Sequence, residues 1–214
     1  MRLRHAKVVG NPLRPAFASY DRAALRAEAL SRYGLADDVI VLGVLGGSLG
    51  AKVLNDVTAR IVADAEPADM AVLHLTGKAH IDDVGPEAER SAVTWRALAF
   101  EEEMQYFYAA ADIVLSRAGA LTVSELAATG TPAVVVPYAA GTADHQAANV
   151  AHLELAQGAV VVPEAEIDRA AVEIQQLAAD PTRRAAMAAA AAGVGRPDAA
   201  TVIATALREA ADDR

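Results

Sequence analysis

The residues between Asp112 and Glu125 are those best placed to do chemistry in this sequence. An apolar stretch, Asp112-Ile-Val-Leu115, leads into Ser116-Arg-Ala-Gly-Ala-Leu-Thr-Val-Ser-Glu125. In parallel α/β sheets, small molecules bind outside the carboxyl ends of the strands, where free amides of the next helix face the crevice. Gly119 allows the backbone to approach a ligand closely, and Glu125 places two acceptor oxygens one turn into the predicted helix. The segment therefore predicts a ligand site.

A structural interpretation of the same residues stays open. The run Thr122-Val-Ser-Glu125 also matches a capping box. In a capping box the threonine caps the helix, and the threonine and the glutamate satisfy each other's backbone donors. Neither side chain would then need a ligand.

A second glycine-rich turn favours the binding interpretation. Gly46-Gly-Ser-Leu-Gly50 follows the apolar run Val39-Ile-Val-Leu-Gly-Val-Leu45 and precedes the helical pattern Ala51-Lys-Val-Leu-Asn-Asp-Val57. Two strand-to-helix turns of this kind in one sheet indicate a ligand that carries a phosphate at one end. Backbone amides at helix N-termini can hold such an anion without any local excess of basic side chains.

These turns need a sheet to position them, and the chain has the pattern of one. Short runs rich in valine, isoleucine and leucine alternate with helical stretches, which predicts an α/β fold: a doubly wound, mostly parallel, Rossmann-like sheet of about six strands with helices on both faces. The strand candidates are Ala6–Val9, Val39–Leu45, Met70–Leu75, Val93–Ala99, Asp112–Leu115, Ala133–Val136 and Ala159–Val162.

The two ends of the chain lack the alternating strand and helix pattern of the middle. Residues 1–14 contain the turn signal Asn11-Pro12 before any domain is built, which suits a hinge entering from an earlier domain. Residues 15–195 form the predicted binding domain, and residues 196–214 a final helix expected to pack back toward that earlier domain. Alanine-rich helices are predicted at Asp168–Ala179, Pro181–Ala192 and Pro197–Ala211, the last two separated by Gly193, Gly195 and Pro197.

Composition and charge narrow the function classes. The chain has 214 residues, a net charge of −9 and no cysteine. The negative charge argues against a general nucleic-acid binder, and the absence of cysteine removes disulfides and thiolate metal sites. The five histidines show no zinc-site spacing, so no metal is expected. Thr76-Gly-Lys78 lacks the remainder of a P-loop, and no apolar run approaches the roughly 20 residues that span a bilayer.

Five motifs in order give the chain a family resemblance over nearly its whole length. Together they resemble the carboxyl-terminal half of the MurG family of GT-B glycosyltransferases. The fourth motif is nearly complete, and no single motif would suffice. The motifs are Gly10-Asn-Pro-Leu-Arg14, Gly46-Gly-Ser-Leu-Gly-Ala51, His74-Leu-Thr-Gly-Lys78, Ser116-Arg-Ala-Gly-Ala-Leu-Thr-Val-Ser-Glu125 and Asp144-His-Gln-Ala-Ala-Asn149.

The resemblance implies an activity. The family transfers N-acetylglucosamine from UDP-GlcNAc to lipid I (undecaprenyl-diphospho-MurNAc-pentapeptide), which makes lipid II for peptidoglycan. It implies no cofactor, and it places the general base and the lipid I pocket in an amino-terminal domain. No catalytic residue is therefore assigned in this chain, and the acceptor would be reached through such a domain or a separate partner chain. The implied location is cytoplasmic, peripheral on the inner face of the cell membrane, with indirect membrane contact.

The resemblance also implies roles for individual residues. Ser48 matches a serine whose loop lies near the donor diphosphate, Arg14 matches an arginine beside the uracil, and Glu101 occupies a position whose main chain reads the uracil edge. Gln146 matches a glutamine that holds the sugar hydroxyls, with Asn149 one turn further on the same face. The ribose-phosphate clamp, with amides toward the diphosphate and the Glu125 carboxylate on the ribose, is implied at Ala120, Leu121, Thr122, Val123, Ser124 and Glu125.

Two other functions are alternatives to a glycosyltransferase. A non-catalytic UDP-sugar-binding subunit or sensor would use the same contacts without an acceptor site. An NAD-dependent oxidoreductase fits poorly, because the turn at Gly46 lacks Gly-x-Gly-x-x-Gly spacing and no acidic residue follows the next strand. His74 and His145 are interpreted as structural rather than catalytic.

Overall fold

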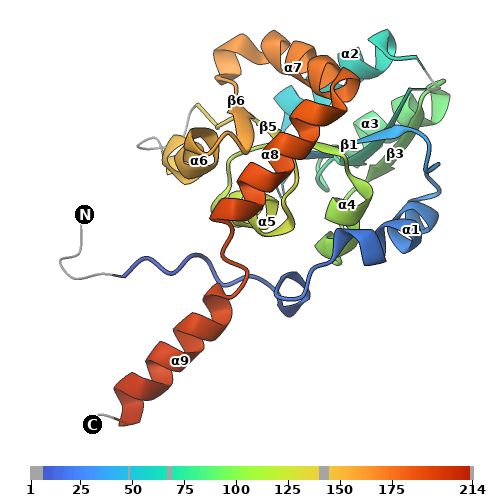
Figure 1. Ribbon diagram of the computed structural model, residues 1–214. Helices are drawn as coiled ribbons and strands as arrows, with labels where there is room; N and C mark the ends of the chain where they lie inside the picture. Colours follow the sequence, from blue (N-terminus) through green and yellow to red (C-terminus); the bar gives the residue numbers. More distant parts are fainter. Residues whose placement is uncertain (1–6, 48, 67–68, 140–144, 213–214) are drawn as a thin grey trace.

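The computed structural model describes residues 7–47, 49–66, 69–139 and 145–212 of the chain. Its centre is a six-stranded, fully parallel sheet in the order β3-β2-β1-β4-β5-β6 (Figure 1). The order reverses between β1 and β4, which is where ligands bind in doubly wound sheets. The strands are β1 (Ile40–Leu45), β2 (Met70–Leu75), β3 (Thr94–Leu98), β4 (Ile113–Ser116), β5 (Ala133–Val135) and β6 (Ala159–Val161).

Helices cover both faces of the sheet, so its central strands are buried and apolar. One face packs on α1 (Arg22–Tyr33), α4 (Met104–Ala110), α5 (Ala120–Thr129) and α6 (His145–Leu155). The other packs on α2 (Lys52–Asp64), α3 (Ile81–Arg90) and α7 (Ile167–Ala179). Helix α8 (Pro181–Val194) contributes to both cores, and two short 3-10 turns, η1 (Pro15–Phe17) and η3 (Glu164–Glu166), complete the domain. The predicted fold class is confirmed.

The last helix, α9 (Ala199–Asp212), extends away from the sheet (Figure 1). Of its described residues only Ala199 is buried. The amino-terminal segment touches its start, since a Cβ built at Gly10 would lie 2.8 Å from Cβ of Arg196 and 3.3 Å from Cβ of Ala199. The amino-terminal segment and the start of α9 therefore meet beside the sheet domain.

Two details of the predicted elements are wrong. The strand predicted at Ala6–Val9 is absent from its described residues 7–9, because Val8 is 93% exposed and pairs with no neighbouring strand. Gly193 does not break the helices apart, since α8 continues through it to Val194 and the chain leaves the helix at Gly195. A Cβ at Gly193 would meet nothing within 4 Å, so no packing demand ends the helix there.

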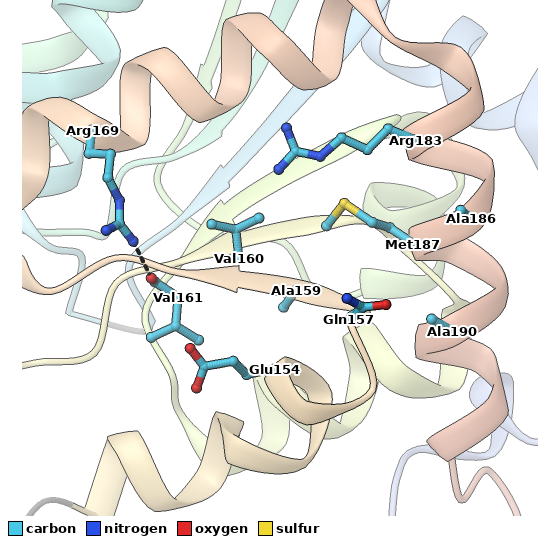
Figure 2. A pocket seen from close by; sticks show the side chains of 10 residues that line it. All are labelled: Glu154, Gln157, Ala159, Val160, Val161, Arg169, Arg183, Ala186, Met187 and Ala190. Carbon is cyan, nitrogen blue, oxygen red and sulfur yellow. Dashed lines mark hydrogen bonds between the residues drawn. The ribbon is translucent and has the colours of Figure 1, made fainter.

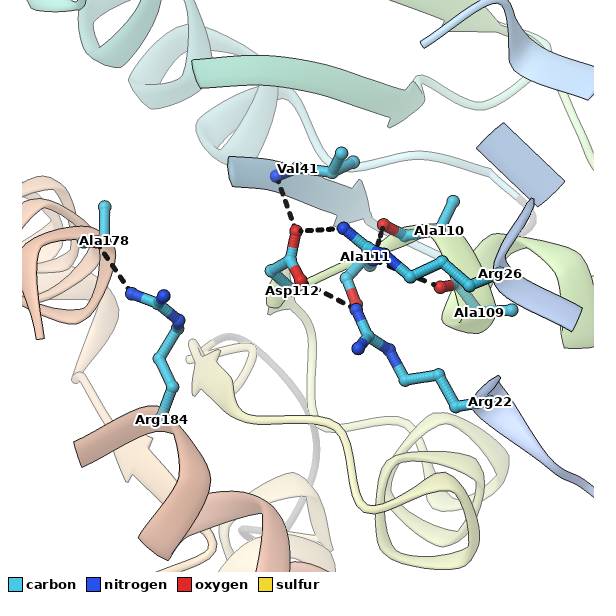
Figure 3. Close-up of polar contacts among 9 residues, drawn as sticks. All are labelled: Arg22, Arg26, Val41, Ala109, Ala110, Ala111, Asp112, Ala178 and Arg184. Atoms are coloured by element: carbon cyan, nitrogen blue, oxygen red, sulfur yellow. Dashed lines mark hydrogen bonds and ion pairs between the residues drawn. The ribbon is translucent and has the colours of Figure 1, made fainter. Parts of the chain in front are cut away.

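A half-buried carboxylate, that of Asp112, fixes the start of β4 to the rest of the domain (Figure 3). Asp112 accepts hydrogen bonds from Arg22 at 2.7 Å, from Arg26 at 3.0 Å and from the amide of Val41 at 2.9 Å. These contacts join α1, β1 and β4 at the end of the sheet opposite the predicted site. Asp112 is thus a structural residue.

Asp112→Ala is expected to lower the free energy of unfolding by about 2–4 kcal/mol, because the amide of Val41 loses this acceptor and two guanidinium groups keep only backbone carbonyls and no counter-charge. Chemical denaturation measures the change. The matched control is Asp168→Ala, which breaks the Arg60 pair of a carboxylate that is 82% exposed and should cost under about 1 kcal/mol. Equal losses for the two variants would contradict the structural role of Asp112.

Candidate functional site

Two helices without side-chain caps begin at the point where the strand order reverses. Helix α5 follows β4 with Gly119 at its N-cap position, and α2 follows β1 with Ala51 there. The first intrahelical bond of α5 runs from the amide of Val123 to the carbonyl of Gly119 at 2.9 Å. Helix geometry therefore leaves the amides of Ala120, Leu121 and Thr122 without an intrahelical acceptor. Such an amide group is a site for an anion.

A pocket of about 770 Å³ lies in front of α2 at this edge. It is formed by the glycine turn after β1, the start of α2, and side chains from four other segments. Its lining residues are Gly46, Gly47, Leu49, Gly50, Ala51, Lys52, Val53, Asp56, Arg117, Tyr138, Gln146 and Glu164. Ser48, the serine predicted near the diphosphate, lies outside the described residues.

The glycine turn is locked against the turn that follows β2. Gly50 and Gly77 both have positive φ, +77° and +84°, and their backbones touch. Behind them Asn55 donates to the carbonyl of Thr76 at 3.5 Å, and its Oδ1 lies 3.0 Å from Nε2 of His74. Burial lowers the pKa of His74 to about 3, so this histidine is neutral. The structural interpretation of His74 is supported.

Glu125 lies one turn into α5, as predicted, in a largely buried setting. Its carboxylate accepts a hydrogen bond from the hydroxyl of Tyr108 at 2.9 Å. Burial raises the pKa of Glu125 above its ordinary value of 4.5, while the Tyr108 hydrogen bond and the charge of Arg14 act in the opposite direction. The site therefore contains a carboxylate in an apolar environment, one of whose oxygens is already held.

The capping-box interpretation of this segment is wrong. Helix α5 begins at Ala120, two residues before Thr122, and no side chain caps it. Thr122 is therefore already inside the first turn, and Glu125 bonds to Tyr108 instead of reaching back. Ser124 donates to the carbonyl of Ala120 at 2.9 Å and accepts from Asn11 at 2.8 Å, which ties the amino-terminal segment to the start of the helix.

Arg14 lies in the same part of the site as Glu125. Its guanidinium donates to the backbone carbonyl of Glu102, in the loop between β3 and α4. The side chain of Glu101 in that loop turns inward, where it accepts from Tyr33 at 2.8 Å and from the amide of Glu103 at 2.8 Å. The side chain of Glu101 is therefore engaged within the protein, and the main-chain role of this residue stays a prediction.

Gln146 and Asn149, both on α6, form hydrogen bonds to the turn before α5. Oε1 of Gln146 accepts from the amides of Ala118 at 3.2 Å and Tyr138 at 2.9 Å. Asn149 donates to the carbonyl of Ala118 at 3.0 Å. These bonds use the carbonyl end of Gln146 and orient its amide, so that its Nε2 hydrogens are the group left for a ligand.

Arg117 was not singled out from the sequence, yet it is central to the pocket. It is 9% exposed, pairs with Glu164 at 2.6 Å and lies over the ring of Tyr138 at 5.2 Å. It also donates to the carbonyl of Val136 at 3.2 Å. An arginine directly after a predicted strand end was the available signal. Its partner Glu164 comes from beyond β6 and could not be found without the fold.

The site residues fall into two adjoining groups. The glycine turn, Arg117 and Gln146 line the pocket, whereas Arg14, Glu125 and the backbone near Glu101 gather on the other side of the α5 start. Val123 belongs to neither group. Its side chain is 1% exposed and its amide bonds within the helix, so neither is available to a ligand. Leu121 is 57% exposed at the first turn of α5.

A separate hollow of about 480 Å³ lies along the edge strand β6 (Figure 2). Its two arginines are already engaged: Arg169 donates to the carbonyl of Val161 at 2.7 Å, and Arg183 pairs with Glu173 at 2.8 Å. Glu154 and Gln157 enter it from α6 and the turn that follows. None of the predicted site residues lines this hollow.

A metal-binding cluster and a membrane-spanning helix are both absent from the part of the chain that the structure describes. Within it, no group of three or more histidine, aspartate or glutamate side chains is arranged to hold a metal ion. None of the described helices has both the length and the apolar character needed to cross a bilayer.

Comparison with known families decides what kind of domain this is. Residues 41–203 match the profile of the glycosyltransferase family 28 C-terminal domain. The chain belongs to that family. The matched range begins one residue into β1 and contains the other five strands, both glycine turns and the start of α5, whereas η1 and α1 lie before it.

Relatives extend the match over most of the chain. It is 43% identical over 203 residues to the UDP-N-acetylglucosamine--N-acetylmuramyl-(pentapeptide) pyrophosphoryl-undecaprenol N-acetylglucosamine transferase of Mycolicibacterium paratuberculosis, which covers 94% of this chain and 49% of that protein. The enzyme of the same name from Mycobacterium tuberculosis is 42% identical over 206 residues, covering 95% and 50%. The chain thus spans about half the length of these curated relatives.

Solved structures agree with the sequence match. The crystal structure of Acinetobacter baumannii MurG superposes with a TM-score of 0.75 at 26% identity, over 90% of this chain and 55% of that one. WaaG, a glycosyltransferase involved in lipopolysaccharide biosynthesis, shares the fold with a TM-score of 0.62 at 16% identity. The resemblance of this family 28 domain to the carboxyl-terminal half of MurG is confirmed.

Proposed function

We propose that this chain binds UDP-GlcNAc and, together with an acceptor domain, transfers its N-acetylglucosamine to lipid I. The observation that carries the proposal is the pair of uncapped helix N-termini at the sheet's switch point, with the Glu125 carboxylate one turn into the second helix. Backbone amides donate hydrogen bonds to a diphosphate, and a carboxylate accepts them from two neighbouring hydroxyls. A nucleoside diphosphate sugar carries both of these groups.

The two groups of site residues would bind different parts of the UDP-GlcNAc donor. The amides at the start of α5 and the glycine turn would hold the diphosphate, and Glu125 would accept the ribose hydroxyls. Arg14 and the main chain at Glu101 would border the uracil. The Nε2 hydrogens of Gln146 would donate to a sugar oxygen, with Asn149 acting mainly by holding the turn at Ala118.

The chemistry assigned to this domain is that of the leaving group. In an inverting displacement at the anomeric carbon, the bond to the UDP oxygen breaks as the acceptor hydroxyl of lipid I attacks from the opposite side. Negative charge then grows on the diphosphate, where fixed amide dipoles stabilise it in the transition state. The general base and the lipid pocket belong to the acceptor domain in this proposal.

The ends of the chain are assigned to the connection with that domain. Residues 1–14 would form the hinge, and residues 196–214 would pack against the acceptor domain. The meeting of Gly10 with Arg196 and Ala199, and the exposure of α9, support this arrangement. The assembled enzyme would act at the cytoplasmic face of the membrane, where the lipid acceptor lies.

A transfer assay tests the activity. The chain is combined with the amino-terminal half of the Mycolicibacterium paratuberculosis relative and given UDP-GlcNAc and lipid I. The proposal predicts formation of lipid II and release of UDP. A stable complex of the two halves that binds donor and acceptor but transfers no sugar would contradict it. That result would instead favour a non-catalytic UDP-sugar-binding subunit.

Gln146→Ala is expected to weaken UDP-GlcNAc about tenfold and UDP less than about threefold. The lost Oε1 contacts to the amides of Ala118 and Tyr138 affect both ligands, whereas the lost Nε2 donors affect only the ligand that carries the sugar. Calorimetric titration with both ligands measures the difference. Equal weakening of the two would remove Gln146 from the sugar pocket.

A further inference from the structure

Tyr108 is a buried phenol that contacts the site from behind. It lies on α4, is 0% exposed, and its hydroxyl donates to Oε2 of Glu125 on α5 at 2.9 Å. A hydroxyl in an apolar core requires a partner, and here the partner is the carboxylate proposed to bind the ribose. The bond thus links the packing of the core directly to the ligand-facing group.

The phenol is held firmly in place. Its ring packs edge-on against Phe107 at 5.3 Å and against Phe17 at 6.0 Å between ring centroids. Both phenylalanines are at most 1% exposed. A ring enclosed in this way has one position for its oxygen, so it also defines one position for the carboxylate oxygen that accepts from it.

One hydrogen bond leaves the carboxylate with capacity to spare. An ionised carboxylate offers about four lone-pair positions, and Tyr108 occupies one of them. The others are sufficient for two neighbouring hydroxyls. The phenol also favours the ionised form of Glu125, opposing the burial that raises its pKa.

We infer that Tyr108 is a positioning residue for donor binding, whose hydrogen bond holds the Glu125 carboxylate in the orientation that accepts the two ribose hydroxyls of a uridine nucleotide. The inference rests on the proposed function, and it assigns to Tyr108 no contact with the ligand. Its effect should therefore appear only with nucleotides that possess those hydroxyls.

The test compares UDP with 2′,3′-dideoxyuridine diphosphate in calorimetric titrations of the wild-type chain and Tyr108→Phe. The phenylalanine fills the same space, so the core is preserved. We expect UDP to bind about tenfold more weakly to the variant, as fits the loss of one hydrogen bond to a charged group. The dideoxy nucleotide should change less than about twofold.

Tyr106→Phe is the matched control. Tyr106 lies on the same helix and donates to Glu28 at 2.9 Å, but on the exposed surface. Its loss should change neither nucleotide's affinity by more than about twofold, since that bond lies outside the site. A Tyr106→Phe variant that weakened UDP as much as Tyr108→Phe would overturn the inference, because it would show a general effect of α4.

The pH profile gives a second readout. The groups that act on Glu125 are Tyr108 from α4 and Arg14 from the amino-terminal segment. Loss of the phenol removes a bond to the ionised form, which raises the pKa of Glu125 further. UDP binding should therefore fail at a higher pH on acidification in Tyr108→Phe than in the wild type.

The failures of the inference and of the proposed function are distinguishable. Wild-type chain that binds no UDP overturns both. Wild-type chain that binds UDP, with Tyr108→Phe weakening both nucleotides equally or neither, overturns the inference alone. Selective weakening of UDP together with the shifted pH profile supports it.

Discussion

Glu125→Gln is expected to abolish most of the affinity for uridine nucleotides, weakening UDP and UDP-GlcNAc alike by about a hundredfold or more. The carboxylate is expected to accept two ribose hydroxyls, and each charge-assisted hydrogen bond contributes roughly 1.5–3 kcal/mol. A neutral amide keeps the shape of the side chain but loses one acceptor oxygen and the charge. Calorimetric titration with both nucleotides measures the loss.

The wild-type pH dependence follows from the same group. Binding needs the ionised carboxylate, and burial raises the pKa of Glu125 above 4.5. The affinity for UDP is therefore highest above that raised pKa and falls as the pH drops through it. Glu28→Gln is the control, because Glu28 also accepts from a tyrosine, Tyr106, but on the surface. Unchanged UDP affinity in Glu125→Gln would contradict the assignment of the ribose clamp.

Gly50→Ala is expected to lower the free energy of unfolding by about 3 kcal/mol or more and to impair nucleotide binding. Its φ of +77° strains any residue with a side chain. The added Cβ would also overlap the carbonyl oxygen of Thr76, which belongs to the neighbouring turn and cannot rotate away. The two turns must separate to accommodate the methyl group, which displaces the amides at the start of α2.

Gly193→Ala serves as the control for Gly50→Ala. Gly193 lies inside α8, and a Cβ there meets nothing within 4 Å. Alanine in a helix interior is favoured over glycine, so this variant should gain about 0.5–1 kcal/mol. Denaturation of both variants measures the contrast. A Gly50→Ala protein as stable as the wild type would show that the two turns are not locked as described.

The sheet was predictable because its strands carry the pattern that burial on both faces demands. Runs such as Val41–Leu45 and Met70–Leu75 are apolar except for His74, and glycine turns mark where each meets its helix. The end of the chain was less clear, since alanine-rich helices have no single boundary residue. Gly193 lies within α8 because an exposed helical glycine costs only about 1 kcal/mol.

The roles of individual site residues were less accessible. A capping box and a ligand clamp share the sequence Thr122 to Glu125, and the capping box is excluded only by the start of α5 at Ala120 and the bond from Tyr108 to Glu125. The inward turn of Glu101 depends on Tyr33, 68 residues away. The pairing of Arg117 with Glu164 spans 47 residues. Such contacts are set by tertiary packing, which local pattern does not encode.

The most direct test of the account is calorimetric titration of the purified chain with UDP-GlcNAc, UDP and NAD in parallel. The account predicts saturable binding of both uridine nucleotides and none of NAD, because the glycine turn, the α5 amides and Glu125 all lie within this chain. A folded chain that binds neither uridine nucleotide would contradict its central claim.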